Sequence, residues 1–239
     1  MADLLPAVDV LQAFASLFAA PHVEAMQATA AIDSLHKADC VLRNARPEGK
    51  GQDWKLLPTL LSAAAGRRGS FVEIGGLDGY EGSNTLVLER CFNWTGMLIE
   101  GNPTNFQRLL RARRSVPSVH SAVCATGGTG SVNISVHGGS VAGQVDLMAP
   151  KFIRRFGKTT KPWMTTPVPC RPLSALMAEV GLSSATFLNL DVEGAEELVL
   201  RTVDPRAFRA IMVELDGTNK AKDDRVVELL LQVGFRPKP

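Results

Sequence analysis

The sequence predicts an α/β fold in which helices cover both faces of a mostly parallel, Rossmann-like sheet. From Ser70 onward, short apolar runs alternate with helical patterns, and parallel strands need crossover connections of this kind. A glycine-rich turn follows the first apolar run, and an acidic residue, Glu100, follows the second. Both positions are typical of sheets that bind a ligand beyond the carboxyl ends of their strands.

Five apolar runs and five amphipathic segments make up the alternating region. The expected strands are 71–74, 97–99, 118–123, 186–190 and 211–215. The expected helices are 83–92, 104–114, 173–180, 195–202 and 223–233. A basic, glycine-rich stretch from Thr126 to Pro169 interrupts the alternation and predicts an insertion.

A helical segment is expected to precede this region. Its apolar residues recur at spacings of three and four, which predicts an apolar stripe that packs on another surface. The stripe consists of Leu4, Val8, Leu11, Ala15 and Phe18. We therefore expect an N-terminal helical extension over residues 1–45, a connector with a short helix over 46–69, and the main domain over 70–239.

The composition is that of an ordinary soluble protein. Of the 239 residues, 45% are hydrophobic, and a chain of this length buries a core without metal or disulfides. The uncharged stretch from Val10 to Val23 is shorter than the roughly 20 apolar residues of a membrane span. A cleaved secretory signal is not expected, because Asp3 and Asp9 stand where positive charges would be. The cytoplasm is the default compartment.

The four cysteines contain no Cys-x-x-Cys pair, so the sequence encodes neither a zinc site nor a thioredoxin-type redox pair. They are Cys40, Cys91, Cys124 and Cys170. We expect four buried thiols and no metal.

Charge is distributed unevenly, although the net charge is only +2. Residues 103–172 hold ten basic residues and one acid, a local charge of +9, whereas residues 186–228 hold ten acids and six bases. A basic segment of this kind binds an acidic substrate or nucleic acid, or forms a solvated surface, and the solvated surface is the commoner case.

The turn after the first strand contains Gly75, Gly76, Gly79 and Gly82. Glycines let the backbone approach a ligand closely, and the helix that follows offers free N–H groups to a carboxylate or phosphate. An NAD site is disfavoured, because the dinucleotide fingerprint requires glycine where Leu77 and Tyr80 stand.

Acidic residues follow three of the expected strands. Glu100 lies 25 residues beyond Gly75 and can accept hydrogen bonds from ribose hydroxyls. Asp191 and Glu193 follow the strand at 186–190, and Glu214 and Asp216 lie at the end of the last one. These features fit a ligand with a ribose, a carboxylate and cationic groups, and S-adenosylmethionine has all three.

Four collinear blocks carry a family resemblance. They are residues 71–75 with Asp78-Gly79 and 82–85, residues 94–100 with Asn102-Pro103, residues 187–196, and residues 211–214. With these blocks the sequence resembles the FkbM-type methyltransferases, a branch of the class I S-adenosylmethionine-dependent fold, over roughly residues 51–235.

The resemblance implies methyl transfer from S-adenosylmethionine, most often to a hydroxyl oxygen. By position, Glu73 replaces the family's usual Asp at the methionine end, Glu100 would hold the ribose, and Ala122 and Val123 would line the adenine. The full set of expected cofactor residues is Glu73, Gly75, Gly76, Asp78, Gly79, Ser83, Asn84, Glu100, Asn102, Ala122, Val123 and Asp191.

The acceptor is expected to be a small molecule or a glycan-like compound. Asp191 or Glu193 would be the catalytic residue that takes the hydroxyl proton. The insertion lies where class I methyltransferases build acceptor pockets, so basic residues there are candidates for binding an acidic acceptor. They are Lys151, Arg154, Arg155 and Lys158.

Two other functions stay open at this point. The basic segment 103–172 favours a nucleic-acid methyltransferase, although no interleaved aromatic pattern for base stacking accompanies it. The second alternative is a non-catalytic, methyltransferase-like binding protein. It derives from the end of the sequence at Pro239, where class I folds normally add a closing hairpin. Without that hairpin, an exposed sheet edge would favour an oligomer.

Overall fold

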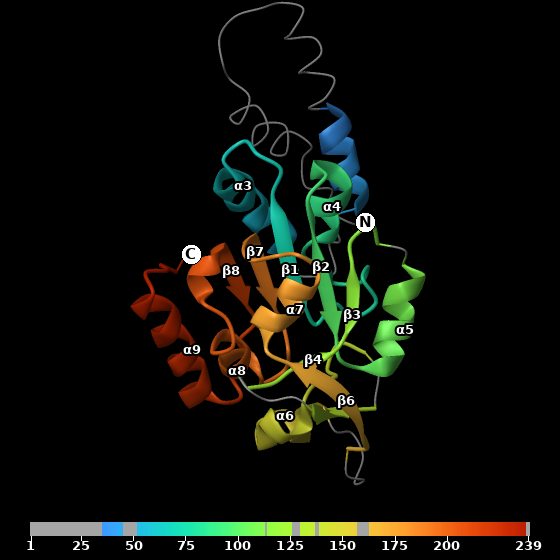
Figure 1. The fold of residues 1–239 in the computed structure, drawn as a ribbon, viewed down its shortest axis with the longest axis vertical. Coiled ribbons are helices and arrows are strands. Elements are labelled where there is room, and N and C mark those ends of the chain that lie inside the picture. Colours follow the sequence, from blue (N-terminus) through green and yellow to red (C-terminus); the bar gives the residue numbers. More distant parts are fainter. Residues whose placement is uncertain are drawn as a thin grey trace, which may run out of the picture.

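The computed structural model describes residues 35–44, 52–112, 114–125, 130–136, 139–156 and 163–237. Two sheets organise them (Figure 1). The larger sheet has the strand order β3-β2-β1-β7-β8 and is parallel throughout, whereas the smaller sheet has the order β4-β6-β5 and is mixed.

The strands are β1 (Ser70–Ile74), β2 (Thr95–Glu100), β3 (Ser118–His120), β4 (Ala122–Val123), β5 (Gly130–Ser135), β6 (Thr165–Arg171), β7 (Ala185–Leu190) and β8 (Phe208–Val213). The labelled helices are α3 (Gln52–Ala64), α4 (Leu86–Phe92), α5 (Pro103–Arg111), α6 (Pro150–Phe156), α7 (Leu173–Glu179), α8 (Glu196–Leu200) and α9 (Lys220–Gln232), with short 3-10 turns η1 (Val145–Leu147) and η2 (Pro205–Ala207).

Alternate side chains of the large sheet enter two apolar cores, one on each face. Phe71 and Phe187 pack with α3, α4 and α5, whereas Val72 and Leu188 pack with α7, α8 and α9. All four side chains are buried at 1% exposure or less. The predicted parallel sheet with helices on both faces is therefore confirmed.

The predicted strand at 118–123 divides at Ser121, because the chain passes there from one sheet to the other. β3 pairs with β2 in the large sheet, and β4 pairs with β6 in the small one. The Ser121 hydroxyl donates to the carbonyl oxygens of Ala122 (2.8 Å) and Pro169 (3.1 Å). The insertion after β4 supplies β5, α6 and β6, which are not among the strands and helices expected above.

The start of the chain is described incompletely. Residues 1–34, which carry the predicted stripe, and residues 45–51 of the connector lie outside the described residues. Residues 35–44 form a helix whose Val41 joins the apolar core beneath α3. At the other end of the chain, β8 pairs only with β7, so among the described residues the β8 edge of the large sheet carries no further strand.

The expectation of four buried thiols is wrong. Cys40 and Cys91 form a disulfide that joins the helix at 35–44 to α4, and Cys124 and Cys170 form a second one that joins the end of β4 to β6. The partners are 51 and 46 residues apart, and spacing alone does not reveal such pairing.

Within the described ranges, no helix combines the length and the apolar character that a membrane crossing requires.

Disulfide formation can be tested on the full chain by alkylation under denaturing conditions. We expect all four cysteines to resist iodoacetamide until a reductant is added, with peptides linked as Cys40–Cys91 and Cys124–Cys170 in a non-reducing digest. Loss of each bond should lower the free energy of unfolding by about 4 kcal/mol, because each closes a loop of roughly 50 residues. Alkylation of the unreduced chain would contradict the pairing.

Candidate active site

Two adjacent cavities lie at the carboxyl ends of β1, β2 and β7, where sheets of this type bind ligands. Their volumes are about 60 and 90 Å³, and Gly75, Glu100, Ala142 and Asp191 line both of them. The first cavity, here called the apolar lobe, is lined by aliphatic residues that include Ile99, Ala122, Val123 and Ile134. The second, the polar lobe, is lined by residues that include Glu73, Ser83, Asn105 and Asn189.

The Glu73 carboxylate fixes the end of the glycine-rich turn through hydrogen bonds. Its carboxylate is 1% exposed and accepts four hydrogen bonds. Oε1 accepts from the Asn84 amide (3.0 Å) and the Asn189 side chain (3.1 Å). Oε2 accepts from the hydroxyls of Ser83 (2.8 Å) and Thr85 (2.5 Å). These bonds satisfy a buried charge and fix the backbone that leads into α4.

Arg114 fastens the same turn from the far end of α5. Its side chain is 1% exposed and forms an ion pair with Glu89 on α4 at 2.5 Å. The guanidinium also donates to the carbonyl oxygen of Gly79 (2.7 Å) and to the hydroxyls of Ser83 (3.1 Å) and Thr85 (3.0 Å). In the sequence, this residue stood out only as a member of the basic segment.

Gly75 has no room for a side chain. Its φ is +85°, and a Cβ atom there would lie 1.9 Å from the carbonyl oxygen of Asp191. The amides of Gly75 and Gly76 both donate to the carbonyl oxygen of Ile99 at 3.0 Å. The turn therefore lies directly against the ends of β2 and β7, which brings residues from three strands together.

Glu100 ends β2 between the two lobes. Its carboxylate is 5% exposed and accepts from the amides of Leu77 (2.8 Å) and Asn102 (2.6 Å). Burial raises the pKa of Glu100 to about 7, against the lowering effect of these backbone hydrogen bonds. A carboxylate oxygen accepts more than one hydrogen bond, so capacity is left for hydroxyl groups of a ligand.

Two asparagines after β2 bond to the chain around the lobes, Asn102 at Ser135 and Asn105 at Gly139. The Asn102 side chain donates to the carbonyl oxygen of Ser135 at 2.6 Å and caps α5 through its oxygen. The Asn105 side chain bonds both backbone groups of Gly139, at 2.9 and 3.1 Å. We call residues 139–144 the roof, and Ala142 and Gly143 of this segment line the apolar lobe.

Four carboxylates lie close together beyond the ends of β7 and β8, and we call them the acidic group: Asp191, Glu193, Glu214 and Asp216. Burial raises the pKa of Asp191 well above its ordinary value, and a hydrogen bond and charge repulsion from Glu214 raise it further. The pKa of Glu193 is raised to about 8. Burial is the largest cause, and charge repulsion from Glu214 and Asp216 contributes to the same shift. Glu193 has a φ of +52°, a strained conformation for a residue with a side chain. This acidic group is suited to a cationic ligand.

A lysine lies beside the acidic group. Lys222 of α9 forms a buried ion pair with Glu196 of α8, whose other oxygen accepts from the Gly194 amide at 2.8 Å. Lys222 lowers the pKa of Glu193, but burial and the neighbouring acids outweigh it. Because Glu196 and Lys222 are 26 residues apart, sequence reasoning did not connect them.

Nine of the twelve expected cofactor residues line the two lobes, and three do not. Asp78, Gly79 and Asn84 support the turn instead. The Asp78 carboxylate accepts from the amides of Tyr80 (2.9 Å) and Glu81 (2.7 Å), and Asn84 bonds to Glu73. Residues that sequence reasoning missed also line the lobes, among them Ser121, Ile134, Gln144, Asn105 and Asn189.

The expected acceptor residues lie apart from these cavities. Lys151, Arg154 and Arg155 are exposed on α6, which packs inward through Phe152, and they line neither lobe. Lys158 falls outside the described residues. Among the residues that are described, no cluster of three or more His, Cys, Asp or Glu side chains could hold a metal ion.

The chain was compared with curated proteins, with solved structures and with family models. The first two comparisons found no match. The family model of the methyltransferase FkbM domain matches residues 73–237, more than two thirds of the chain. The match includes the turn, Glu100 and the acidic group, and it confirms the resemblance seen in the sequence. The chain therefore belongs to the FkbM methyltransferase family.

Proposed function

We propose that this chain transfers a methyl group from S-adenosylmethionine to a hydroxyl oxygen of a small-molecule or glycan-like acceptor. One observation carries the proposal: the partly buried carboxylates Asp191 and Glu193 of the acidic group lie beside the glycine-rich turn and an apolar lobe. Burial raises the pKa values of Asp191 and Glu193, and neighbouring carboxylates raise them further, so the group suits a cationic ligand.

The residues present fit S-adenosylmethionine. The apolar lobe suits an adenine, Glu100 suits the ribose hydroxyls, and the acidic group suits a sulfonium and an ammonium. Cavities of about 60 and 90 Å³ are smaller than the roughly 300 Å³ or more of typical ligand sites. Binding therefore requires the roof, residues 139–144, to move outward.

Bound S-adenosylmethionine supplies an electrophilic methyl group on a positively charged sulfur. The protein then has to position the acceptor and take its proton. A carboxyl group acts as a base only when ionised, and a positive charge nearby lowers the pKa of Asp191 and Glu193. Asp191 and Glu193 are thus ionised in the cofactor complex, and an ionised carboxylate can accept the hydroxyl proton of the acceptor.

The charges around the site favour an uncharged acceptor. Once the bound cofactor has lowered the pKa values of Asp191 and Glu193, their ionised carboxylates oppose the approach of an anion to the reacting centre. Binding of an acidic acceptor through Lys151, Arg154, Arg155 and Lys158 stays a prediction. Reversal of Arg154 and Arg155 to Glu tests it, because it would weaken the affinity for such an acceptor.

Ion pairs within the protein make a nucleic-acid substrate less favoured, because they involve residues of the basic segment 103–172. Arg114 is buried and paired with Glu89, and Arg171 pairs with Glu179. Some of the local charge of +9 is therefore compensated and cannot bind phosphates.

The two disulfides favour an oxidising compartment, since such bonds are rare in the reducing cytosol of most organisms. We therefore propose maturation outside the cytosol, in place of the default that the sequence suggested. Recovery of the native protein from its own cells with free thiols would contradict this.

The cofactor assignment predicts that Glu100→Gln weakens binding of S-adenosylmethionine and S-adenosylhomocysteine by at least about tenfold, because hydrogen bonds to a charged group are the stronger ones. Calorimetric titration measures this, with NAD as the negative ligand. The matched control is Glu228→Gln, an exposed residue of α9. No binding by the folded wild-type chain would instead indicate a non-catalytic binding protein.

The raised pKa of Glu193 predicts the pH dependence of stability. The folded state holds this proton up to about pH 8, whereas the unfolded chain releases it near pH 4.5. The stabilising contribution is therefore complete below pH 4.5 and is lost as the pH rises to about 8. Urea unfolding between pH 5 and 8.5 should show a shallower decline for Glu193→Gln than for wild type or Glu228→Gln. Equal declines would show that Glu193 ionises normally.

The general-base assignment predicts a loss of rate in Asp191→Asn or Glu193→Gln by about 100-fold or more at saturating cofactor. The measurement is transfer of a labelled methyl group to a panel of phenols, polyols and oligosaccharides. Asp224→Asn, on the exposed side of α9, serves as the control. Full rates in both site variants would remove both residues from this role.

A further inference from the structure

One wall of the apolar lobe belongs to the small sheet. Ala122 and Val123 of β4 line the lobe, and Ile134 of β5 lines it as well. β4 and β5 are the two strands that flank β6. The shape of the lobe therefore depends on how firmly β4 is held against β6.

Backbone pairing between β4 and β6 is short. β4 is two residues long and forms two residue pairs with β6, whereas β5 forms six. The Cys124 amide donates to the carbonyl oxygen of Arg171 at 3.3 Å, beyond the common upper limit of about 3.2 Å. The Ser121 hydroxyl adds one bond to the carbonyl oxygen of Pro169 at 3.1 Å. A strand this short has little stability of its own.

The disulfide between Cys124 and Cys170 adds a covalent link at this point. Cys124 directly follows the wall residue Val123, and both cysteines are buried. Shortly after Cys170, α7 begins with Leu173, which is fully buried in the core that also contains Val123. The bond therefore ties the end of β4 to a part of the chain that the core already holds. It also removes the chain entropy that the two strands would gain by separating.

The disulfide between Cys40 and Cys91 has the same chemistry in a different place. It joins the helix at 35–44 to α4, and neither of its cysteines lines a lobe. The partners of the two bonds are 51 and 46 residues apart, so loss of either bond costs a similar amount of stability. An effect that is confined to the second bond therefore reports its place beside the lobe.

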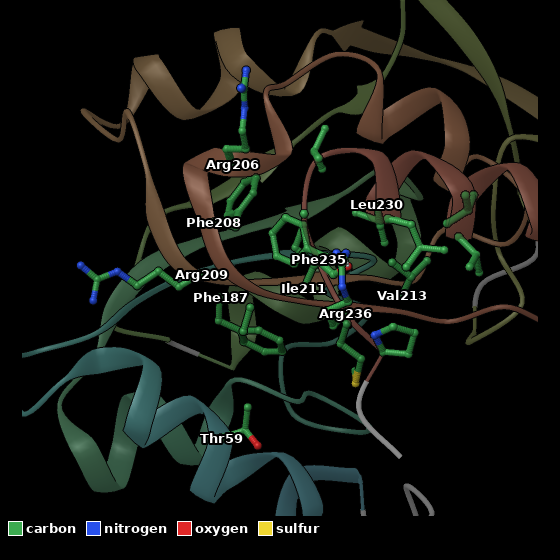
Figure 2. A pocket seen from close by; sticks show the side chains of 18 of the residues that line it. Thr59, Phe187, Arg206, Phe208, Arg209, Ile211, Val213, Leu230, Phe235 and Arg236 are labelled. Atoms are coloured by element: carbon green, nitrogen blue, oxygen red, sulfur yellow. Dashed lines mark hydrogen bonds between the residues drawn. The ribbon is translucent and has the colours of Figure 1, made fainter.

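β8 provides a reference region that is remote from this wall. It borders a cavity of about 700 Å³, and Figure 2 shows Phe187, Phe208 and Leu230 around it. This cavity shares no described lining residue with the two lobes, and none of the four cysteines lines it.

We propose that the Cys124–Cys170 disulfide is a positioning element of the cofactor site, because it holds Ala122 and Val123 in the arrangement that receives the adenine. A wall that is ordered in advance does not have to be ordered when the cofactor enters, and this preorganisation strengthens binding. The inference rests on the proposed function, in which the apolar lobe takes the adenine.

Calorimetric titration of the full chain with S-adenosylhomocysteine tests the proposal. Cys124→Ser/Cys170→Ser should weaken binding by at least about tenfold, whereas the matched control Cys40→Ser/Cys91→Ser should keep the wild-type affinity within about twofold. A second variant, Cys124→Ala/Cys170→Val, keeps apolar volume in the core without the covalent bond and should bind as weakly as the serine variant. Circular dichroism checks that each variant is folded at the temperature of the titration.

Hydrogen exchange without ligand, read by mass spectrometry, gives a result that does not depend on the cofactor. Amides of residues 121–124 should exchange at least about tenfold faster in the two variants that lack the Cys124–Cys170 bond than in wild type. The rates of β8 should stay the same in these variants. Cys40→Ser/Cys91→Ser should leave the rates of residues 121–124 unchanged.

The outcomes separate this inference from the proposed function. Wild-type affinity or unchanged exchange in the variants without the Cys124–Cys170 bond would overturn the inference. An equal loss of affinity in Cys40→Ser/Cys91→Ser would also overturn it, since the bonds would then act through overall stability. Absence of S-adenosylhomocysteine binding by the folded wild-type chain would instead refute the proposed function, and this inference with it.

Discussion

The buried carboxylate of Glu73 is the interaction on which the geometry of the site depends. A charge at 1% exposure is costly unless hydrogen bonds satisfy it, and here the donors come from the glycine turn, from the start of α4 and from β7. Arg114 supports the same hydroxyls from the side of α5. Loop, helices and sheet are thereby held as one unit, so Gly75 and the Leu77 amide stay against β2 and β7.

The acidic group at the ends of β7 and β8 has the opposite character. Burial and neighbouring carboxylates raise the pKa of Glu193, and Glu193 is held in a strained backbone conformation. Backbone strain and unfavourable electrostatics persist only where the surrounding structure holds the residue in place, and they are found most often at functional sites. The satisfied network around Glu73 supplies that rigidity at the neighbouring strand end.

Sequence reasoning succeeded where burial dictates the pattern and failed where pairing is non-local. The strands at 71–74, 97–99 and 186–190 are apolar on both faces apart from Glu73, Thr186 and Asn189, because both faces of a parallel sheet are covered. β6 was missed because Pro167 and Pro169 argue against a strand. The disulfides, the Lys222–Glu196 pair and the supporting role of Arg114 depend on contacts between residues far apart, which no local spacing encodes.

The second disulfide has a consequence for how such proteins diverge. The Cα atoms of Cys124 and Cys170 lie 5.5 Å apart, so the chain returns to the place it left after 46 residues. The residues between them, which include β5 and α6, form an inserted segment whose two ends are joined by the disulfide. Its length and sequence can change while the five-stranded sheet stays intact, much as variable loops diverge on a constant scaffold. The roof and the end of β5, where Ile134 lines the apolar lobe, have to keep their fit at the ligand site, so exchange of the remainder offers a route to new acceptors.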